Sequence, residues 1–351
     1  MDADIPTRPT LADVAARAGV SASTASLAFS GSGPVSETTR ERVLAAAREL
    51  DYGGPDPRAR SLRRGRSGIV GVVVEERVRE AFRDPIKIAM LDGLAEAIGP
   101  LGAGLLLLTD TGGGAVSIAS TPLDAVVLIG CSPRLGDSVA VLRQRGIPMV
   151  AIEGDPGEGV TEISLDNRDA TRLGAQHLRA LGHTDVALVT LPTDATRMRG
   201  RLTPEREAAS TSATTTDRIA GTRDVFPLAT GVVASASYIE EGLIAGRELL
   251  ADLAGRPTAI IAQSDLLAAG VIRAAEELGL AVPADLSVLG FDGVRVDGLA
   301  PYDLTTLVQP ATAKGRAAGE AIVRMLDGER PESVTFMSVF HLGNTTAPPR
   351  R

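Results

Sequence analysis

Near its start the chain carries three short segments in which apolar residues recur at helical spacing. The residues that share one face are Leu11, Val14, Ala15 and Ala18 in the first segment, Ala25, Ala28 and Phe29 in the second, and Val43, Leu44, Ala47 and Leu50 in the third. Gly19 offers the backbone freedom that ends a helix, and Ser21 and Ser36 are suited to begin the next two as N-caps. Three short helices with a tight turn between the first two predict a helix-turn-helix unit.

From Gly68 onward, continuous apolar runs alternate with helical stretches. The runs are IVGVVV from residue 69, GLLLLT from 104, DAVVLIG from 124, IPMVAI from 147, DVALVT from 185, PTAIIA from 257 and DLSVLG from 285. Such runs are typical of strands covered on both faces, and their alternation with helices predicts parallel sheets wound by helices. We therefore expect an N-terminal all-α headpiece and an α/β core of two doubly wound parallel-sheet subdomains.

Size and composition agree with a chain of several globular domains. The 351 residues are 44% hydrophobic and 23% charged, which favours a large core. The single cysteine, Cys131, ends an apolar run and is expected to be a buried, inert thiol. Because no basic and apolar leader pattern and no run of about 18 apolar residues occurs, the sequence predicts a cytoplasmic protein.

Charge is distributed unevenly along the chain. The net charge is −8, yet residues 1–66 hold ten arginines, no lysine and eight acidic residues, and the stretch RARSLRRGR contains no acid at all. This stretch is either a solvated linker or a segment that contacts phosphates. An acidic protein does not coat nucleic acid, so any DNA contact is expected from the N-terminal segment and should weaken steeply with salt.

Taken in order, several blocks resemble the lactose-repressor family of bacterial transcription regulators (LacI/GalR type). The blocks are TLADVAARAGVS, VSETTRERVLAAARELDY, ARSLRRGRSGIVGVVV, SLDNRDATRLGAQHLRALGH, AIIAQSDLLAAG with the sequence that follows it as far as GFDG, LTTLVQP and GNTTAPPR. The resemblance implies a DNA-binding headpiece over residues 1–54, a minor-groove hinge over 55–67, and a periplasmic-binding-protein-like core over 68–351. It further implies a homodimeric repressor of a palindromic double-stranded operator, controlled by a small-molecule effector.

A recognition helix must approach base edges closely, and short side chains permit that approach. By resemblance, Ala22, Ser23 and Leu27 read bases, while neighbouring hydroxyls contact phosphates or base edges. Leu27 stands where the family often has a long polar residue, so contact with a thymine methyl is expected instead. The headpiece residues expected at DNA are Thr10, Ser21, Ala22, Ser23, Thr24, Ser26 and Leu27.

The hinge segment departs from the family pattern in detail. Ala59 and Leu62 lie three residues apart, on one face of a short helix, with Arg58 and Arg63 beside them. The resemblance implies that Leu62 wedges between base pairs together with its dimer mate. The segment holds one residue more than is usual, and Asp56 stands where asparagine is common, in a place where it can cap the hinge helix.

Effector pockets in this fold lie between the subdomains, at the carboxyl ends of strands. By resemblance, Arg197 in RMRG and Asp292 in GFDG clamp the ligand, and Ser264 replaces an amide contact; a structural ion pair is the alternative for the first two. By resemblance, Ile86 and Lys87 align with positions that are commonly aromatic, and Lys87 favours an anionic effector unless it is an exposed lysine on the lip. The expected ligand is a sugar or an anionic metabolite.

Other chemistry finds little support in the sequence. His177 and His183 are six residues apart, which does not place them on one helical face, and no third ligand accompanies them. The TGGGA stretch lacks the context of a phosphate loop. The rival classes are a solute-binding protein of the same core fold, which requires an export signal, and a sugar- or nucleotide-converting α/β enzyme, which requires a nucleophile with its base or a cofactor loop. We therefore expect a regulator without cofactor, metal or catalysis.

Overall fold

The computed structural model describes residues 9–31, 33–54, 65–74, 78–109, 117–130, 134–253 and 255–350. The chain divides into two compact units, Met1–Ser67 and Gly68–Arg351. The predicted hinge contacts lie outside the described residues, as do the glycine-rich stretch and the cysteine: Asp56, Arg58, Ala59, Leu62, Arg63, residues 111–115 and Cys131.

The first unit contains the three helices predicted for the headpiece. Its helices are α1 (Leu11–Ala18), α2 (Ala22–Ser30) and α3 (Glu37–Glu49). Thr10 caps α1 in a reciprocal arrangement, because its Oγ1 accepts from Asp13 N at 3.3 Å while its own N donates to Asp13 Oδ2 at 2.8 Å. Gly19 ends α1 in the left-handed region with φ 63°, and Ser21 and Ser36 cap α2 and α3, all as predicted.

Small apolar side chains form the headpiece core. The buried residues are Val14, Ala15, Ala18, Ala25, Ala28, Val43, Ala46 and Ala47. Phe29 and Tyr52 close one side with an edge-to-face contact at 5.7 Å between ring centroids. Because alanine dominates, the helices approach closely, and the exposed beginning of α2 is held on a compact support.

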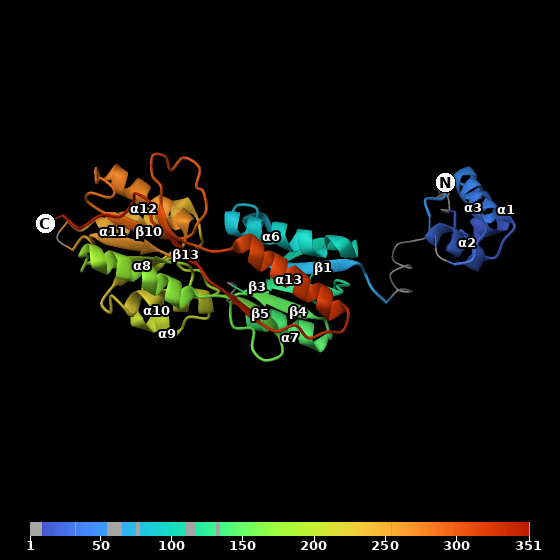
Figure 1. Ribbon diagram of the computed structural model, residues 1–351, viewed down its shortest axis with the longest axis horizontal. Coiled ribbons are helices and arrows are strands. Elements are labelled where there is room, and N and C mark those ends of the chain that lie inside the picture. The colour runs from blue at the N-terminus through green and yellow to red at the C-terminus, as the bar shows by residue number, and fades with distance from the viewer. Residues whose placement is uncertain are drawn as a thin grey trace, which may run out of the picture. The chain divides into compact units, whose positions relative to one another are not determined.

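The second unit contains two sheets, seen side by side in Figure 1. In the N-terminal subdomain the strand order is β12-β5-β4-β3-β1-β2, and every pair is parallel. The strands are β1 (Ile69–Val74), β2 (Gly104–Thr109), β3 (Ala125–Ile129), β4 (Met149–Ile152), β5 (Thr161–Leu165) and β12 (Val334–Phe336). The flanking elements are α5 (Val78–Ala81), α6 (Pro85–Ile98) with η1 (Gly99–Leu101), α7 (Leu135–Gln144) and α13 (Ala311–Leu326).

The C-terminal subdomain has the order β13-β11-β10-β9-β6-β8-β7, with antiparallel strands only at its two edges among the described residues. Its strands are β6 (Val186–Thr190), β7 (Gly200–Arg201), β8 (Thr230–Val233), β9 (Ala259–Ala262), β10 (Ser287–Asp292), β11 (Thr305–Val308) and β13 (Val339–His341). Its helices are α8 (Asn167–Leu181), α9 (Pro204–Ala208), α10 (Ala213–Arg223), α11 (Ile239–Leu250) and α12 (Asp265–Glu277).

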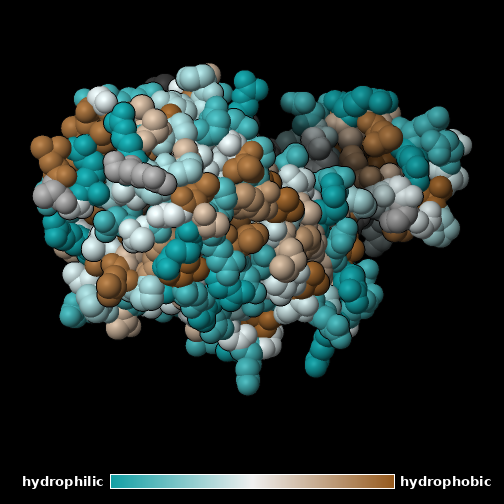
Figure 2. Space-filling model, turned by 60° about the vertical axis from the view of Figure 1, so that its left-hand side comes forward, coloured by the Kyte–Doolittle hydropathy of each residue, from teal (hydrophilic) through white to brown (hydrophobic). Residues whose placement is uncertain are grey.

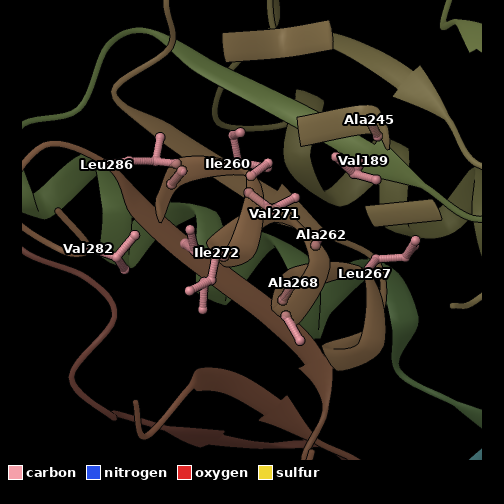
Figure 3. Close-up of a cluster of buried hydrophobic side chains, with 14 of the residues drawn as sticks. Val189, Ala245, Ile260, Ala262, Leu267, Ala268, Val271, Ile272, Val282 and Leu286 are labelled. Atoms are coloured by element: carbon pink, nitrogen blue, oxygen red, sulfur yellow. The ribbon is translucent and has the colours of Figure 1, made fainter. Parts of the chain in front are cut away.

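Both faces of each sheet are covered, which is why the strands read as continuous apolar runs. In β6, Ala187 and Val189 pack toward α11 and α12, whereas Val186 and Leu188 pack toward α8. Figure 3 shows the first of these layers, where Val189 lies beside Ala245 of α11 and Ile260 beside Val271 of α12. The expected fold is confirmed, and all seven apolar runs are strands.

Glycines let paired helices come unusually close. A Cβ at Gly93 in α6 would lie 2.0 Å from the carbonyl oxygen of Thr312 in α13, and one at Gly315 would lie 1.9 Å from that of Met90. A Cβ at Gly242 in α11 would likewise lie 2.1 Å from the carbonyl oxygen of Leu267 in α12. These contacts fix the helices whose ends reach the region between the sheets.

The chain crosses between the subdomains three times, after β5, after β11 and after β12. At the first crossing Asp166 Oδ1 accepts hydrogen bonds from Ser338 N at 2.9 Å and from Ser338 Oγ at 2.7 Å, so the first and third crossings are tied together. On the surface in Figure 2, hydrophobic side chains are interspersed among hydrophilic ones. Among the large exposed apolar residues are Phe82 and Ile88, next to and within α6.

Candidate functional site

A cleft between the two subdomains of the core encloses about 700 Å³ of atom-free space, including its open mouth. Three helices begin at it, because Asp84, Ser212 and Ser264, the N-caps of α6, α10 and α12, all line it. Helix N-termini present unpaired backbone N–H groups and a partial positive charge. The cleft is therefore suited to a polar ligand that carries acceptor oxygens.

All four residues predicted for the effector line this cleft: Lys87, Arg197, Ser264 and Asp292. Lys87 is 9% exposed, and its Nζ lies 3.7 Å from Asp84 Oδ2, so it is not an exposed lysine on the lip. Ser264 Oγ accepts from Leu267 N at 3.2 Å and from Ser237 Oγ at 2.8 Å. Arg197 is half-buried on the loop that follows β6.

Asp292 ends β10 at the carboxyl edge of the sheet and is 8% exposed. Its Oδ1 accepts from Gln309 Nε2 at 2.6 Å and lies 3.8 Å from Arg218 Nη1. No hydrogen bond from the described residues reaches its Oδ2. Burial holds the pKa of Asp292 well above 3.8, although the charge of Arg218 acts to lower it, and the neighbouring Asp265 and Asp84 add to the rise.

Arg218, which the sequence reasoning did not single out, is the cation that pairs with Asp292. It is 3% exposed; its Nε donates to Asn167 Oδ1 at 2.8 Å, its Nη1 donates to the carbonyl of Gln263 at 2.5 Å, and its guanidinium lies 3.5 Å from the centre of the Phe291 ring. Within the described part of the chain, its Nη2 makes no hydrogen bond.

A sequence signal for Arg218 exists in the spacing of α10. Ser212, Thr215 and Arg218 follow one another at intervals of three and all line the cleft. This polar stripe could be recognised as one helical face. The sequence does not tell how far along the chain the helix after β6 begins, and here a loop, β7 and α9 intervene.

A second pair of buried charges consists of Glu153, which lines the cleft, and Lys314, which lies behind it; they are 2% and 0% exposed. The Lys314 ammonium donates to Glu153 Oε1, and Asn167 Nδ2 donates to Oε2 at 2.9 Å. Burial raises the pKa of Glu153, but the charges of Lys314 and Arg218 and these hydrogen bonds outweigh it and bring the pKa from 4.5 to about 2. Glu153 is therefore a carboxylate at neutral pH.

Backbone strain gathers at the same place. Among the described residues, the non-glycine positions with positive φ are Asp51, Glu153, Arg197 and Asp292. Three of these four line the cleft, with φ of 62°, 50° and 122° respectively. Strained conformations persist where the surroundings enforce them, and they gather at functional sites.

In the headpiece, the beginning of α2 is exposed. Ser21, Ala22 and Ser23 are exposed, whereas Thr24, Ser26 and Leu27 are half-buried. The Ser21 hydroxyl is occupied by the cap, since Oγ accepts from Thr24 N at 3.1 Å and lies 2.8 Å from Thr24 Oγ1. The Thr10 hydroxyl is held in the same way by Asp13. Leu27 packs over the turn after α2, since a Cβ at Gly33 would lie 3.1 Å from its Cδ2.

Among the described residues no group of three or more His, Cys, Asp and Glu is placed to hold a metal ion. His183 instead anchors the C-terminal segment, with Nε2 2.9 Å from the carbonyl oxygen of Ala347 and Nδ1 2.8 Å from Thr258 Oγ1. His177 Nε2 lies 3.0 Å from Thr346 Oγ1. No helix in the described part of the chain is long and apolar enough to cross a membrane.

Each of the two units contains a stretch that matches a known protein family. Residues 10–54 match the family described as bacterial regulatory proteins, lacI family, and residues 175–346 match the periplasmic binding protein-like domain. The HTH-type transcriptional regulator IpsA of Corynebacterium glutamicum is 34% identical over 97% of this chain and 98% of its own length. The HTH-type transcriptional repressor CytR of Escherichia coli is 29% identical over 92% of this chain and 90% of its own.

Among solved structures, a LacI-family regulator from Corynebacterium glutamicum superposes with a TM-score of 0.71 at 29% identity, over 97% of this chain and 100% of that one. The regulator CelR, solved as a cellobiose complex, gives a TM-score of 0.66 at 26% identity, over 96% of this chain and 100% of that one.

A helix-turn-helix headpiece joined to a core with a cleft between two subdomains defines a ligand-responsive DNA-binding protein. The chain belongs to the LacI family of bacterial regulatory proteins and is a DNA-binding transcriptional regulator. That family consists of transcriptional regulators and not of enzymes, which excludes the enzyme alternative raised by the sequence.

Proposed function

We propose that the protein is a homodimeric repressor that binds a palindromic operator and releases it when a small polar effector enters the cleft. The observation that carries the proposal is the cleft itself, where the buried Arg218 and Asp292 present a donor and an acceptor with no partner in the described chain. In this proposal Arg218 takes the clamping role that the family resemblance implies for Arg197, and Arg197, Ser264 and Lys87 line the walls.

The proposed ligand is a hydroxyl-rich molecule, such as a sugar or its anionic derivative. Arg218 Nη2 and Asp292 Oδ2 together suit a hydroxyl, which both donates and accepts. The three helix N-termini and Lys87 favour additional acceptor oxygens such as those of a carboxylate or phosphate. None of the described residues that line the cleft is aromatic, which argues against a planar base held by stacking. CelR in complex with cellobiose supports a sugar-like ligand.

On the DNA side, Ala22 and Ser23 are proposed to face base edges, since both are exposed at the start of α2. Thr24, Ser26 and Leu27, which are half-buried, follow on the same helix and are proposed to contact DNA at its edge. Ser21 and Thr10 cap their helices with their hydroxyls, and these helix starts are proposed to lie near the phosphates. Leu62 is proposed to wedge between the central base pairs, with Arg58, Ala59 and Arg63 around it. The exposed Phe82 and Ile88 support a partner surface next to α6 for a second copy.

A gel-shift titration on palindromic sites from the upstream region of its own gene tests the DNA function. We expect wild type to bind in low salt and Leu62→Ala to bind at least about tenfold more weakly, because the unstacking wedge is lost. The matched control is Leu228→Ala on the core, where the side chain is 93% exposed. Absence of binding by wild type at low salt, or equal loss in both variants, would contradict the proposal.

A thermal-shift screen against paired neutral and anionic ligands, such as glucose with gluconate and glucose 6-phosphate, tests the effector site. A ligand at 100 times its Kd stabilises the folded protein by about 2.7 kcal/mol. We expect Arg218→Gln to abolish the shift and the surface variant Arg247→Gln, which loses only an exposed pair with Glu277, to retain it. A shift that survives in Arg218→Gln would place the ligand elsewhere.

A further inference from the structure

The chain contains only two lysines, Lys87 and Lys314, among 36 basic side chains, and both lie at the cleft or directly behind it. Lys314 is fully buried in α13 and does not line the cleft. A buried ammonium is costly unless every proton finds an acceptor, and its compact shape suits a site where the broad, planar guanidinium of arginine has no room. The contacts of Lys314 therefore indicate a role beyond packing.

Two branches leave the Lys314 ammonium. It donates to Glu153 Oε1 and to Gln309 Oε1. Because an ammonium can only donate, it turns the oxygen of the Gln309 amide toward itself and thereby turns the NH₂ group away. That NH₂ group donates to Asp292 Oδ1 at 2.6 Å. Lys314 thus orients the Gln309 amide so that its NH₂ group, and not its oxygen, lies toward Asp292.

The contacts that start at Glu153 and at Gln309 both lead to the pair formed by Arg218 and Asp292. Glu153 Oε2 accepts from Asn167 Nδ2 at 2.9 Å, and Asn167 Oδ1 accepts from Arg218 Nε at 2.8 Å. Arg218 Nη1 lies 3.8 Å from Asp292 Oδ1, which closes the ring. Every member is at least nine-tenths buried, so the ring is shielded from competing water.

The ring bridges the two subdomains at their crossings. Lys314 lies in α13 and Glu153 directly follows β4, both in the first subdomain, whereas Arg218 in α10 and Asp292 in β10 belong to the second. Asn167 opens α8 just after the first crossing, and Gln309 lies in the second crossing between β11 and α13. A change at Asp292 or Arg218 therefore reaches both crossings through hydrogen bonds alone.

We propose that Lys314 is a positioning residue that couples occupancy of the cleft to the angle between the subdomains, by holding Gln309 toward Asp292 and Glu153 toward Asn167. The inference rests on the proposed function, in which a ligand engages Asp292 and Arg218. A ligand that draws Asp292 away from Gln309 leaves the amide held on one side only, and the ring loosens at both crossings. Lys314 itself touches no ligand.

Amide hydrogen exchange on the full-length protein tests this coupling. The Gln309 amide donates to the Asp292 carbonyl at 3.1 Å and the Asp166 amide to the Phe336 carbonyl at 3.1 Å, so both report directly on the crossings. We expect Lys314→Met to speed exchange of the Gln309 and Asp166 amides on the order of 100-fold, while the amides of helices α11 and α12 change far less. Arg316→Met, which removes an exposed cation from the same helix, should change them less than about twofold.

The double variant Lys314→Met/Glu153→Gln separates positioning from simple neutralisation. It removes the unpaired carboxylate, yet Gln309 Oε1 still lacks the ammonium that holds it and, among the described residues, only Asp292 accepts from the side-chain amide, so exchange at Gln309 should stay at least about tenfold faster than in wild type. A return to wild-type rates would reduce Lys314 to a counter-ion, and an even rise across the whole core would reduce it to a packing residue. Either result overturns the proposal.

A second measurement does not depend on removing Lys314. In protein labelled with ¹³C at lysine Cε, only Lys87 and Lys314 give signals, and Lys87→Met assigns them. Asp292→Asn should shift the Lys314 signal although the two residues do not touch, whereas the exposed Asp137→Asn should not. An unmoved Lys314 signal overturns the coupling. Operator binding by wild type is judged separately, so failure of the regulator function and failure of this coupling give different results.

Discussion

A methyl group added at Gly93 should push α6 away from α13 and destabilise the core. The new Cβ would lie 2.0 Å from the carbonyl oxygen of Thr312 and 2.9 Å from the backbone N of Arg316. Carbon and oxygen in contact need over 3 Å, so the helices must separate by about 1 Å, a gap that forfeits a quarter to a half of the dispersion energy of the affected contacts.

The magnitude follows from two opposing terms. Overpacking costs about 1–3 kcal/mol or more, and replacement of a helical glycine by alanine returns about 1 kcal/mol. The backbone of α13 cannot yield as a flexible side chain would, so we expect the upper end of the cost and a net loss of about 2 kcal/mol. For a core of this size that corresponds to a Tm lower by roughly 4–8 °C.

The matched control is Gly136→Ala in α7, where an added Cβ meets nothing within 4 Å. There only the propensity term remains, so we expect a gain of about 0.5–1 kcal/mol and a higher Tm. Differential scanning calorimetry of both variants, with and without a ligand that shifts wild type, is the assay. The two changes must have opposite signs. A neutral or stabilising Gly93→Ala would refute the close approach of α6 and α13, and with it the reasoning that these helices hold Lys87 at the cleft and Lys314 behind it.

Three further outcomes can be checked by unfolding, the first two of them at several pH values. Burial raises the pKa of Asp265 from 3.8 to about 7, although the hydrogen bond from Thr306 acts to lower it. Wild type should therefore lose stability as the pH rises from about 4 to 7, and the cost of Asp265→Asn should fall as the pH rises over that window. A cost independent of pH contradicts this. Burial lowers the pKa of His183 below 6.5, so its contribution is complete above pH 6.5 and is lost as the pH falls below it; His183→Gln should flatten that loss. Ser36→Ala removes the cap of α3 and should lower the free energy of unfolding of the headpiece by about 1 kcal/mol, whereas Thr38→Ala, at an exposed position of the same helix, should lower it little. Unfolding followed by circular dichroism measures both.

Much of the fold could be predicted because its signals are local. The helices of the headpiece depend on spacing and on caps such as Ser21 and Ser36, and the buried strands depend on continuous apolar runs. The strands that went unpredicted are β5, β7, β8, β11, β12 and β13. In β5 the burial alternates along TEISL, and the edge strands β12 and β13 are partly exposed, so none of these carries an uninterrupted apolar run.

By itself the sequence determined the class of the protein: a headpiece with caps at each helix start, an arginine-rich stretch after it, then two wound sheets, with Asp292 at the end of a strand. Only the tertiary structure decided that Arg218 pairs with Asp292, because the choice of arginine depends on where a loop returns the chain to the cleft. It also decided that Lys314, one of two basic residues in the stretch ATAKGRAAG, is fully buried, whereas Arg316 is exposed. Periodicity reports which face of one helix is apolar, whereas burial of a charge depends on partners from distant segments, here Glu153 and Gln309.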